Sequence, residues 1–428
     1  AAFLLLCLPV LGSLIPFRSE RAAPARTRLT LRRTGHRRLV YVTRTLAWYR
    51  LPVFQAIQRR SVDVHIVVAG GPVPGVPDAS ERAASQGLSI HRCGGGPGWR
   101  SDVVETCERI APDVLLIEHG ARVDFAWTLL MTRRLPGVKR VLWTHGIESR
   151  ELYSRLPNTG TPGRWLQLAM ADGILCYHPD TIEALARRFP GKPIAAAPNS
   201  TDGGPILEAR RELLTAGRAA VRRARGLQAP YYLAALGRMM PNKLLHRIPR
   251  ILTRVRERIP DVGLLFLGDG PQRRRILSAS VAQGLVEGRD FHLLGDVREP
   301  RDLTAWLLCS DLVVNPGYMG LTATDALFAG VPVVLAHAGL RGPYHSPEWR
   351  YLRDSVGGIF ARDRSDRAFA EAILDHLRRP AEERRAIQEA CTLHAEERLG
   401  IDPMVRGILG FLEEIALEPE LRAEASLA

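Results

Sequence analysis

Lysine is almost missing from this sequence. Of 59 basic residues only three are lysines, at Lys139, Lys192 and Lys243. Arginine is therefore the default cation, and many arginines fall on amphipathic helical patterns beside acidic residues, as in RRPAEERRAIQEA. A net charge of +14 can indicate a nucleic-acid or anionic-lipid partner. The arginines do not form the aromatic-interleaved pattern of a nucleic-acid platform, so we expect no nucleic-acid partner.

Cysteine is also scarce, and the six that occur are scattered: Cys7, Cys93, Cys107, Cys176, Cys309 and Cys391. They form no close pair and no Cys/His cluster at zinc spacing. This pattern is typical of a reducing compartment. It predicts a chain without a structural metal.

The most apolar segment, residues 1–17 (AAFLLLCLPVLGSLIPF), is short of the roughly 20 residues that span a bilayer and contains two prolines. Eight arginines follow it between Arg18 and Arg38, which is the reverse of the order in a signal peptide. Two interpretations of residues 1–36 stay open: a disordered leader, or a segment attracted to an anionic membrane surface. We expect a cytoplasmic protein, peripheral on the inner face of the membrane under the second interpretation.

From Arg37 onward, short runs rich in Val, Ile and Leu alternate with segments of helical period, and this pattern occurs twice. Such alternation indicates parallel sheets covered by helices on both faces. The chain is long enough for two domains. We predict an α/β protein with doubly wound domains at residues 37–200 and 205–400. The Pro/Asn/Gly stretch at 198–205 is the expected linker. The expected strands are RLVYVTR, VDVHIVVAG, PDVLLIEH, KRVLWTH and DGILCYH in the first domain, and YYLAALG, DVGLLFLGDG, DFHLLG, DLVVNPG and VPVVL in the second.

Two such domains in tandem predict a cleft between the carboxyl ends of their strands, where open parallel sheets bind ligands. The common ligand motifs are missing, however. CGGGPGW and LGDGPQR both fail at the third glycine of G-x-G-x-x-G, and neither a Walker A motif nor an Asp-x-Asp pair occurs. The sequence therefore gives little support to a dinucleotide site.

Two stretches of the second domain suggest an anion site. In ALGRMMPNK, Arg238 and Lys243 flank a turn after a strand, and a guanidinium with an ammonium suits a diphosphate. A solvated loop is an equally good interpretation of that spacing. In NPGYMGLTATDALFAGVPVV, residues 315–334, a glycine-rich turn leads from a strand into a helix, and such a helix start favours anions.

Five motifs of the second half resemble, in order and spacing, the retaining glycosyltransferases of family 4, which belong to the group 1 glycosyl transferases and have the GT-B fold. These motifs are GRMMPNK, LLFLGDGPQRRRILSASVAQGL, FHLLGDV, SDLVVNPGYMGLTATDALFAGVPVV and HSPEWRYLRDSVGG. RLVYVTRTLAWYRLPVF, VLWTHGIESRE and APNSTD are similar to the acceptor domain and linker of that family. IDPMVRGILGFLEEI resembles its closing helix, here residues 402–418, which crosses back to the first domain. The resemblance covers roughly residues 37–418.

The resemblance implies a metal-independent transfer of sugar from a nucleotide diphosphate donor, without a cofactor and with retention of anomeric configuration. Arg238 and Lys243 match the diphosphate-binding pair. The amides of Gly320, Leu321 and Thr322 are then expected to hold the donor phosphates. Gly268, Asp269 and Gly270 match a loop beneath the donor, and Gly295, Asp296 and Val297 match the loop that frames the base.

Asp325 stands where the family has the second of two glutamates eight residues apart, which binds the ribose. It is equally explained as an acid in the first turn of a helix. Gly317 stands in place of the first glutamate, a departure that affects sugar recognition and activity. Glu348 in HSPEWRYL is a candidate substitute that binds the donor, or it caps the next helix.

His145, at the end of a predicted strand, matches the family histidine near the donor sugar. A satisfied loop histidine is the alternative. The resemblance thus implies a glycosyltransferase acting on a glycan or lipid-linked acceptor. Two alternatives remain: a non-catalytic protein that binds nucleotide sugars, and a nucleotide-sugar epimerase of the same fold.

Overall fold

A computed structural model describes residues 37–70, 78–94, 98–119, 124–147, 161–339 and 342–416. The predictions about residues 1–36 lie outside the described residues. All described residues belong to one compact unit, Arg37–Ala428. Within these ranges no helix combines the length and the apolar character needed to cross a membrane.

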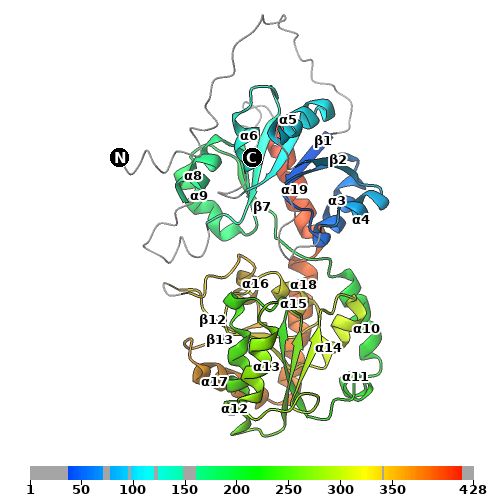
Figure 1. Cartoon of the computed structure of the whole chain (residues 1–428), viewed down its shortest axis with the longest axis vertical. Coiled ribbons are helices and arrows are strands. Elements are labelled where there is room, and N and C mark those ends of the chain that lie inside the picture. Colours follow the sequence, from blue (N-terminus) through cyan, green and yellow to red (C-terminus); the bar gives the residue numbers. More distant parts are fainter. Residues whose placement is uncertain are drawn as a thin grey trace, which may run out of the picture. The chain divides into compact units, whose positions relative to one another are not determined.

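The first half of the chain forms a parallel sheet of seven strands (Figure 1). The strand order is β3-β2-β1-β4-β5-β6-β7, so β1 lies inside the sheet between β2 and β4 and the chain winds outward from it in both directions. The strands are β1 Arg37–Thr43, β2 Val62–Ala69, β3 Ser89–Cys93, β4 Val114–Glu118, β5 Lys139–Thr144, β6 Gly173–Cys176 and β7 Ile194–Ala196.

Helices lie on both faces of this sheet, and alternate residues of each strand enter different cores. In β1, Leu39 and Tyr41 belong to one buried cluster, while Val40 and Val42 belong to another. This alternation explains why the central strands are apolar throughout. The helical elements of this half are η1 Trp48–Arg50, α3 Leu51–Gln58, α4 Ser80–Ser85, α5 Trp99–Ile110, α6 Asp124–Met131, α8 Thr161–Met170, η2 Pro179–Thr181 and α9 Ile182–Arg188.

The second half repeats the arrangement with six parallel strands in the order β10-β9-β8-β11-β12-β13. Its central strand β8 again sends Tyr232 and Ala234 into one core, and Leu233 and Ala235 into the other. The strands are β8 Tyr231–Leu236, β9 Val262–Leu267, β10 Phe291–Gly295, β11 Leu312–Asn315, β12 Val333–Ala336 and β13 Gly358–Ala361. The helical elements are α10 Gly204–Leu214, α11 Arg218–Ala224, η3 Pro241–Lys243, η4 Leu245–Arg247, α12 Ile248–Arg256, α13 Arg273–Val281, α14 Pro300–Leu308, α15 Thr322–Phe328, α16 Trp349–Arg353 and α17 Asp366–Leu377.

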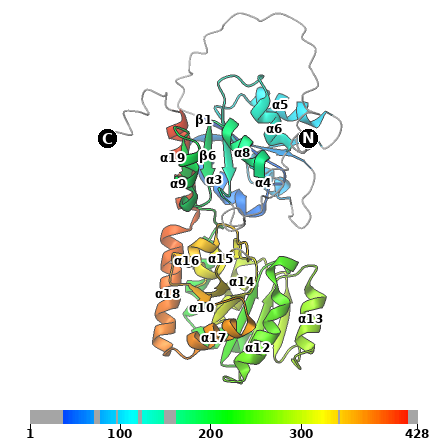
Figure 2. The same cartoon turned by 90° about the vertical axis from the view of Figure 1, so that its left-hand side faces the viewer.

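The last two helices connect the halves (Figure 2). Helix α18, Ala381–Arg398, contributes Cys391 and Ala395 to a core of the second sheet. Helix α19, Ile401–Ala416, buries Met404, Ile408 and Phe411 in a core of the first sheet. The chain therefore returns to its first half, as the resemblance implied for the closing helix.

The predicted fold class of two doubly wound parallel sheets is confirmed, and each of the ten predicted strands is present. Three further strands, β3, β7 and β13, were not predicted. All three are edge strands of three to five residues whose side chains are mostly half-buried. They lack a strong apolar run because one side of an edge strand has no neighbour to pack against.

Candidate active site

Glycines follow or end three neighbouring strands at the carboxyl edge of the second sheet. Gly237 follows β8, Gly268 follows β9, and Gly295 ends β10. The Gly268 amide donates to the Gly295 carbonyl at 2.7 Å. A Cβ at Gly268, whose φ is +141°, would lie 2.4 Å from the Gly237 carbonyl oxygen. Only glycine permits this close approach of the main chains, so no side chain stands at this point of the edge.

Lys243, at the end of η3, folds back over this edge. Its side chain is buried, and Nζ donates to the Leu236 carbonyl at 3.2 Å. A Cβ at Gly237 would lie 2.7 Å from both Lys243 Nζ and Thr322 Cγ2, so the ammonium lies beside the first residue of α15. Desolvation lowers the pKa of Lys243 to about 8, against the opposing effect of Asp325. The ammonium forms no ion pair with a described residue and keeps donors for an anion.

The turn before α15 packs against the turn that carries Lys243. The Tyr318 amide donates to the Asn242 carbonyl at 2.9 Å. A Cβ at Gly317 would lie 2.2 Å from that oxygen and 2.6 Å from the Lys243 carbonyl oxygen. The departure from the family pattern at Gly317 thus has a steric reason: the backbone of the neighbouring turn occupies the space that a glutamate side chain needs.

At the start of α15, the amides of Gly320, Leu321 and Thr322 donate to no acceptor in the described part of the chain. The helix itself has seven residues. Its first turn carries Asp325, whose Oδ1 accepts from Thr201 Oγ1 at 2.9 Å. Burial raises the pKa of Asp325 to about 6, while the Thr201 bond and the charge of Lys243 act in the opposite direction.

Glu348 is buried, and both carboxylate oxygens are engaged. Oε1 accepts from the Asn199 side chain and Oε2 accepts from Ser346 Oγ. Glu348 precedes α16, but its side chain makes no capping bond, so the interpretation as a helix cap is wrong. A donor can use this carboxylate only by sharing it with Asn199 and Ser346.

His345, in the same segment, fixes the turn before α15. Its Nδ1 accepts from the Met319 amide at 3.0 Å, and Nε2 lies 2.9 Å from the Ala336 carbonyl. Burial lowers the pKa of His345 to about 4, so the ring is neutral at pH 7 and Nε2 carries the hydrogen. The histidine therefore joins the Glu348 segment to the end of β12 and to the turn.

The remaining predicted residues lie on exposed loops or near them. Arg238 is exposed directly after Gly237. Asp269 Oδ1 accepts from the Gly270 amide at 2.6 Å, and a Cβ at Gly270 would meet the backbone of Met239 at 2.9 Å. Asp296 pairs with Arg298, and Val297 is half-buried.

His145 lies at the carboxyl edge of the first sheet. It is exposed directly after β5, and its ring centroid lies 4.9 Å from that of Tyr177. The Tyr177 carbonyl in turn accepts from the hydroxyl of Tyr351 on α16 at 3.3 Å. The described contacts thus connect His145 to the second half of the chain through Tyr177, and they do not place it against Lys243 or Asp325.

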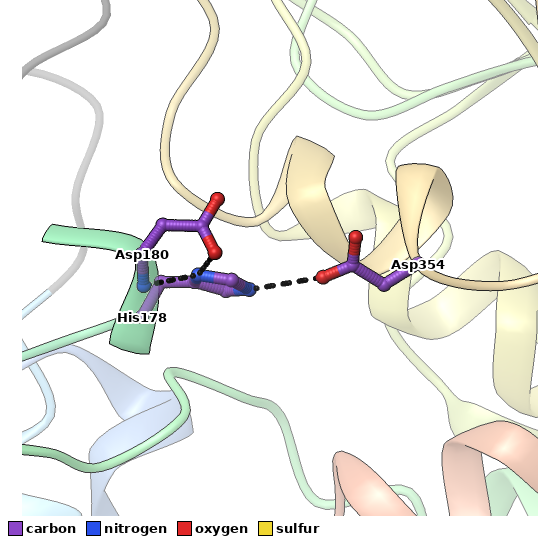
Figure 3. Close-up of side chains that lie close together, drawn as sticks. All are labelled: His178, Asp180 and Asp354. Carbon is purple, nitrogen blue, oxygen red and sulfur yellow. Dashed lines mark hydrogen bonds and ion pairs between the residues drawn. The ribbon is translucent and has the colours of Figure 1, made fainter.

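One group of ligand-type side chains lies together among the described residues: His178, Asp180 and Asp354 (Figure 3). His178 Nδ1 lies 3.4 Å from Asp180 Oδ1, and Nε2 lies 3.5 Å from Asp354 Oδ2. Arg353 donates to both carboxylates, and Arg350 also donates to Asp180. Guanidinium groups therefore already neutralise both acids. Desolvation lowers the pKa of His178 to about 4, so its ring is neutral at pH 7.

The sequence analysis missed the role of the linker. Asn199 and Thr201 are buried and hydrogen-bond to Glu348 and Asp325, the two carboxylates predicted to bind the donor. The only sequence signal was the polar stretch NST inside a segment predicted as a plain connection. It also missed Arg50, which is buried although most arginines were expected on solvated faces.

Known proteins are similar to this chain in one segment of its sequence and in its fold. Residues 230–379 match the family model described as glycosyl transferases group 1. No curated protein matches the chain by sequence.

Among solved structures, a glycosyltransferase from Rickettsia africae is 13% identical with a TM-score of 0.68, covering 89% of this chain and 99% of its own. Anabaena Alr3699/HepE in complex with UDP and glucose is 14% identical with a TM-score of 0.65, covering 88% and 99%. UDP-GlcNAc 2-epimerase from Neisseria meningitidis is 13% identical with a TM-score of 0.58, covering 89% and 100%. At such identities the likeness establishes the fold alone. The resemblance to the group 1 glycosyltransferases is therefore confirmed over residues 230–379, and the chain has the GT-B fold of two doubly wound parallel-sheet domains.

Proposed function

We propose that this protein transfers a sugar from a nucleotide diphosphate sugar to a glycan or lipid-linked acceptor, with retention of anomeric configuration and without a metal. The observation that carries the proposal is the buried Lys243 ammonium, without an ion-pair partner among the described residues, beside a glycine-lined strand edge. This site lies inside the segment that matches the glycosyltransferase family.

The leaving diphosphate determines the chemistry in this proposal. As the sugar becomes cation-like, negative charge builds on the departing phosphate, and donors aimed at that charge lower the barrier. Lys243 and Arg238 supply the cations, and the amides of Gly320, Leu321 and Thr322 supply neutral donors. Asp325 binds the ribose through Oδ2, because Oδ1 accepts from Thr201.

No carboxylate acts as nucleophile in the proposed mechanism. The departing phosphate takes the proton of the acceptor on the same face of the sugar. Catalysis then depends on positioning and electrostatics, so no side chain is indispensable as a base. Glu348, held by Asn199 and Ser346, supports the donor site without taking part in bond formation.

The proposal is tested first by thermal shift with UDP, GDP and ADP, because a ligand that binds only the native state raises the midpoint of unfolding. The nucleotide sugar of the stabilising nucleotide is then supplied with and without candidate acceptors, and release of nucleotide diphosphate is measured. Release that depends on acceptor supports transfer. Conversion of the donor sugar without acceptor would identify an epimerase. Tight nucleotide binding with no turnover of any donor would identify a non-catalytic binding protein.

A further inference from the structure

The carboxyl edge of the first sheet contains a buried cation that no acid of the described chain neutralises. Arg50, the last residue of η1, is 5% exposed. Its Nη2 donates to the Tyr177 hydroxyl at 3.0 Å, and its Nη1 is buried without any hydrogen-bond partner. Burying a guanidinium without an anion costs several kcal/mol, on the order of the desolvation penalty of one ion.

Two arginines of the second half offer a comparison, because each is paired with an acid. Arg350 is 3% exposed and donates to Asp180 at 3.1 Å. Arg222 pairs with Asp311 at 2.7 Å. The buried Arg350 and the partly buried Arg222 thus each have a carboxylate partner, whereas no ion pair of Arg50 occurs among the described residues.

Aromatic rings surround Arg50 in place of carboxylates. Its guanidinium carbon lies 4.1 Å from the ring centroid of Trp143, and 5.3 Å from those of Tyr49 and Tyr177. Trp143 Nε1 is a second buried donor without a partner. Two contacting side chains thus each carry a buried N–H donor that lacks an acceptor among the described residues, and a buried donor without an acceptor is costly.

The position of Arg50 in the fold is that of a ligand site. The arginine follows β1, Trp143 lies on β5 and Tyr177 follows β6, so three strands bring them together at the carboxyl edge. The rings of Tyr49 and Tyr177, which contact Arg50, each also contact an exposed side chain. Trp48 beside Tyr49 is 52% exposed, and His145 beside Tyr177 is exposed. Because Nη1 is buried, a side chain that covers it must move before an anion can reach it. Against the opposing effect of desolvation, Tyr177, Tyr49 and Tyr41 raise the pKa of Arg50, and Glu348 of the second half adds a smaller effect in the same direction without an ion pair.

We propose that Arg50 is the receptor for an anionic group of the acceptor, a phosphate or a carboxylate carried on a sugar. The inference deepens the proposed function and rests on it, since it names the class of acceptor. The experiment distinguishes this anion from the donor diphosphate, because the proposed donor site at Lys243 is filled first. Cation–π contact keeps Arg50 oriented while the site is empty, and the acceptor anion completes its hydrogen bonds.

The experiment uses the full chain with saturating UDP, or with whichever nucleotide stabilises it, so that the donor site is filled. Glucose 6-phosphate, glucuronate and glucose are titrated by calorimetry at constant ionic strength. We expect at least one of the two anions to bind roughly tenfold or more tightly than glucose. Arg50→Gln should abolish that preference and leave nucleotide affinity unchanged, and Arg50→Lys should retain part of it. Arg59→Gln, at an exposed arginine after α3, is the matched control and should behave as the wild type.

Preference for glucose 6-phosphate alone would identify a phosphate acceptor, and preference for glucuronate alone would identify a uronic acid. Equal binding of all three probes by the wild type would overturn the inference, as would an anion preference that survives Arg50→Gln. If Arg50→Gln does not fold, Tyr177→Phe is used in its place. This variant removes only the hydroxyl that accepts from Nη2, and it should change the preference for the anion over glucose. A protein that binds no nucleotide contradicts the proposed function separately. In that case the same three probes are titrated into the ligand-free protein, so that the role of Arg50 is tested independently of the proposed function.

Discussion

The two sheets of this protein have the same winding and very different carboxyl edges. In each, the first strand lies between the second and the fourth, β1 between β2 and β4 and β8 between β9 and β11. At the second sheet, Gly237 and Gly268 bring main chains within van der Waals distance beside the ammonium of Lys243. At the first, Trp143 and Tyr177 enclose the guanidinium of Arg50. Topology determines where ligands bind, and the residues after the strands determine which ligand binds.

The difference has a chemical meaning. Glycine lets amides and a compact ammonium approach a small, highly charged group such as a diphosphate. Aromatic rings around a planar guanidinium suit a larger ligand that combines an apolar face with one anionic substituent. This comparison is the basis of our proposal that the second sheet binds the donor and the first sheet binds the acceptor.

The largest expected effect is that of removing the ammonium of Lys243, which tests whether the second sheet binds the diphosphate. Lys243→Ala should reduce turnover roughly tenfold for each 1.4 kcal/mol of transition-state stabilisation lost, and charge-assisted bonds contribute about 1.5–3 kcal/mol each. Turnover should fall more than donor affinity, because the leaving phosphate gains charge during the reaction. Steady-state kinetics with varied donor measure both.

The matched control is Lys192→Ala, which removes another partly buried lysine whose Nζ donates to the Ala169 carbonyl at 3.2 Å. It should leave turnover unchanged. Wild-type turnover in Lys243→Ala would show that the diphosphate binds elsewhere.

A second test concerns the close approach of the two turns. Gly317→Ala places a methyl group 2.2 Å from the Asn242 carbonyl oxygen, so the turn that carries Lys243 must move. We expect a loss of about 1–3 kcal/mol in the free energy of unfolding, as for overpacked cores, together with weaker nucleotide binding. Urea denaturation and calorimetry measure the two effects.

Gly320→Ala is its control, because a Cβ there would meet only the Tyr318 ring at 3.3 Å and Ser346 at 3.9 Å. It should change stability much less. Equal losses of unfolding free energy in both variants would mean that the close backbone contact at Gly317 does not determine the cost of the added methyl group.

The pH dependence of kcat/KM for the donor offers a finer test. Asp325, with a pKa of about 6, must be ionised to bind ribose, and Lys243, with a pKa of about 8, must be protonated to bind diphosphate. The profile should therefore fall below about pH 6 and above about pH 8.

Thr201→Val should move only the acidic limb of this profile to higher pH, because the Thr201 hydroxyl stabilises the ionised form of Asp325 and lowers its pKa. Asp325→Asn should raise KM for the donor with a smaller effect on kcat. If the acidic limb of the Thr201→Val profile lies at the same pH as in the wild type, Asp325 is not the group that titrates there.

The smallest expected effect is that of chelation. EDTA should leave activity unchanged, because guanidinium groups already neutralise Asp180 and Asp354. If activity disappeared with EDTA and returned with magnesium or manganese, the metal-free mechanism would be wrong. The His178 group would then be the first place to look.

Sequence reasoning reached the fold because central parallel strands such as β9, VGLLFL, are apolar at every position, and this signal is local. The glycine turn and Lys243 could be proposed as site residues from the sequence, since their spacing along the chain is short. Contacts between segments far apart in the sequence produce no comparable local sequence pattern. Nothing in NST predicts that Thr201 reaches Asp325, 124 positions later, and nothing near Arg50 predicts that Trp143 and Tyr177 surround it. These contacts depend on how strands far apart in sequence are ordered in the sheet.

The backbone contact at Gly317 also restricts how this chain can vary. A single substitution to glutamate, which would bring back the family pattern, collides with the carbonyls of Asn242 and Lys243 before it meets any ligand. The substitution becomes tolerable only after the turn at residues 241–243 has changed shape. The order of mutations therefore matters: the effect of glutamate at position 317 depends on the residues of another loop. A library that varies position 317 alone should return glycine, whereas one that varies it together with residues 241–243 can return other side chains.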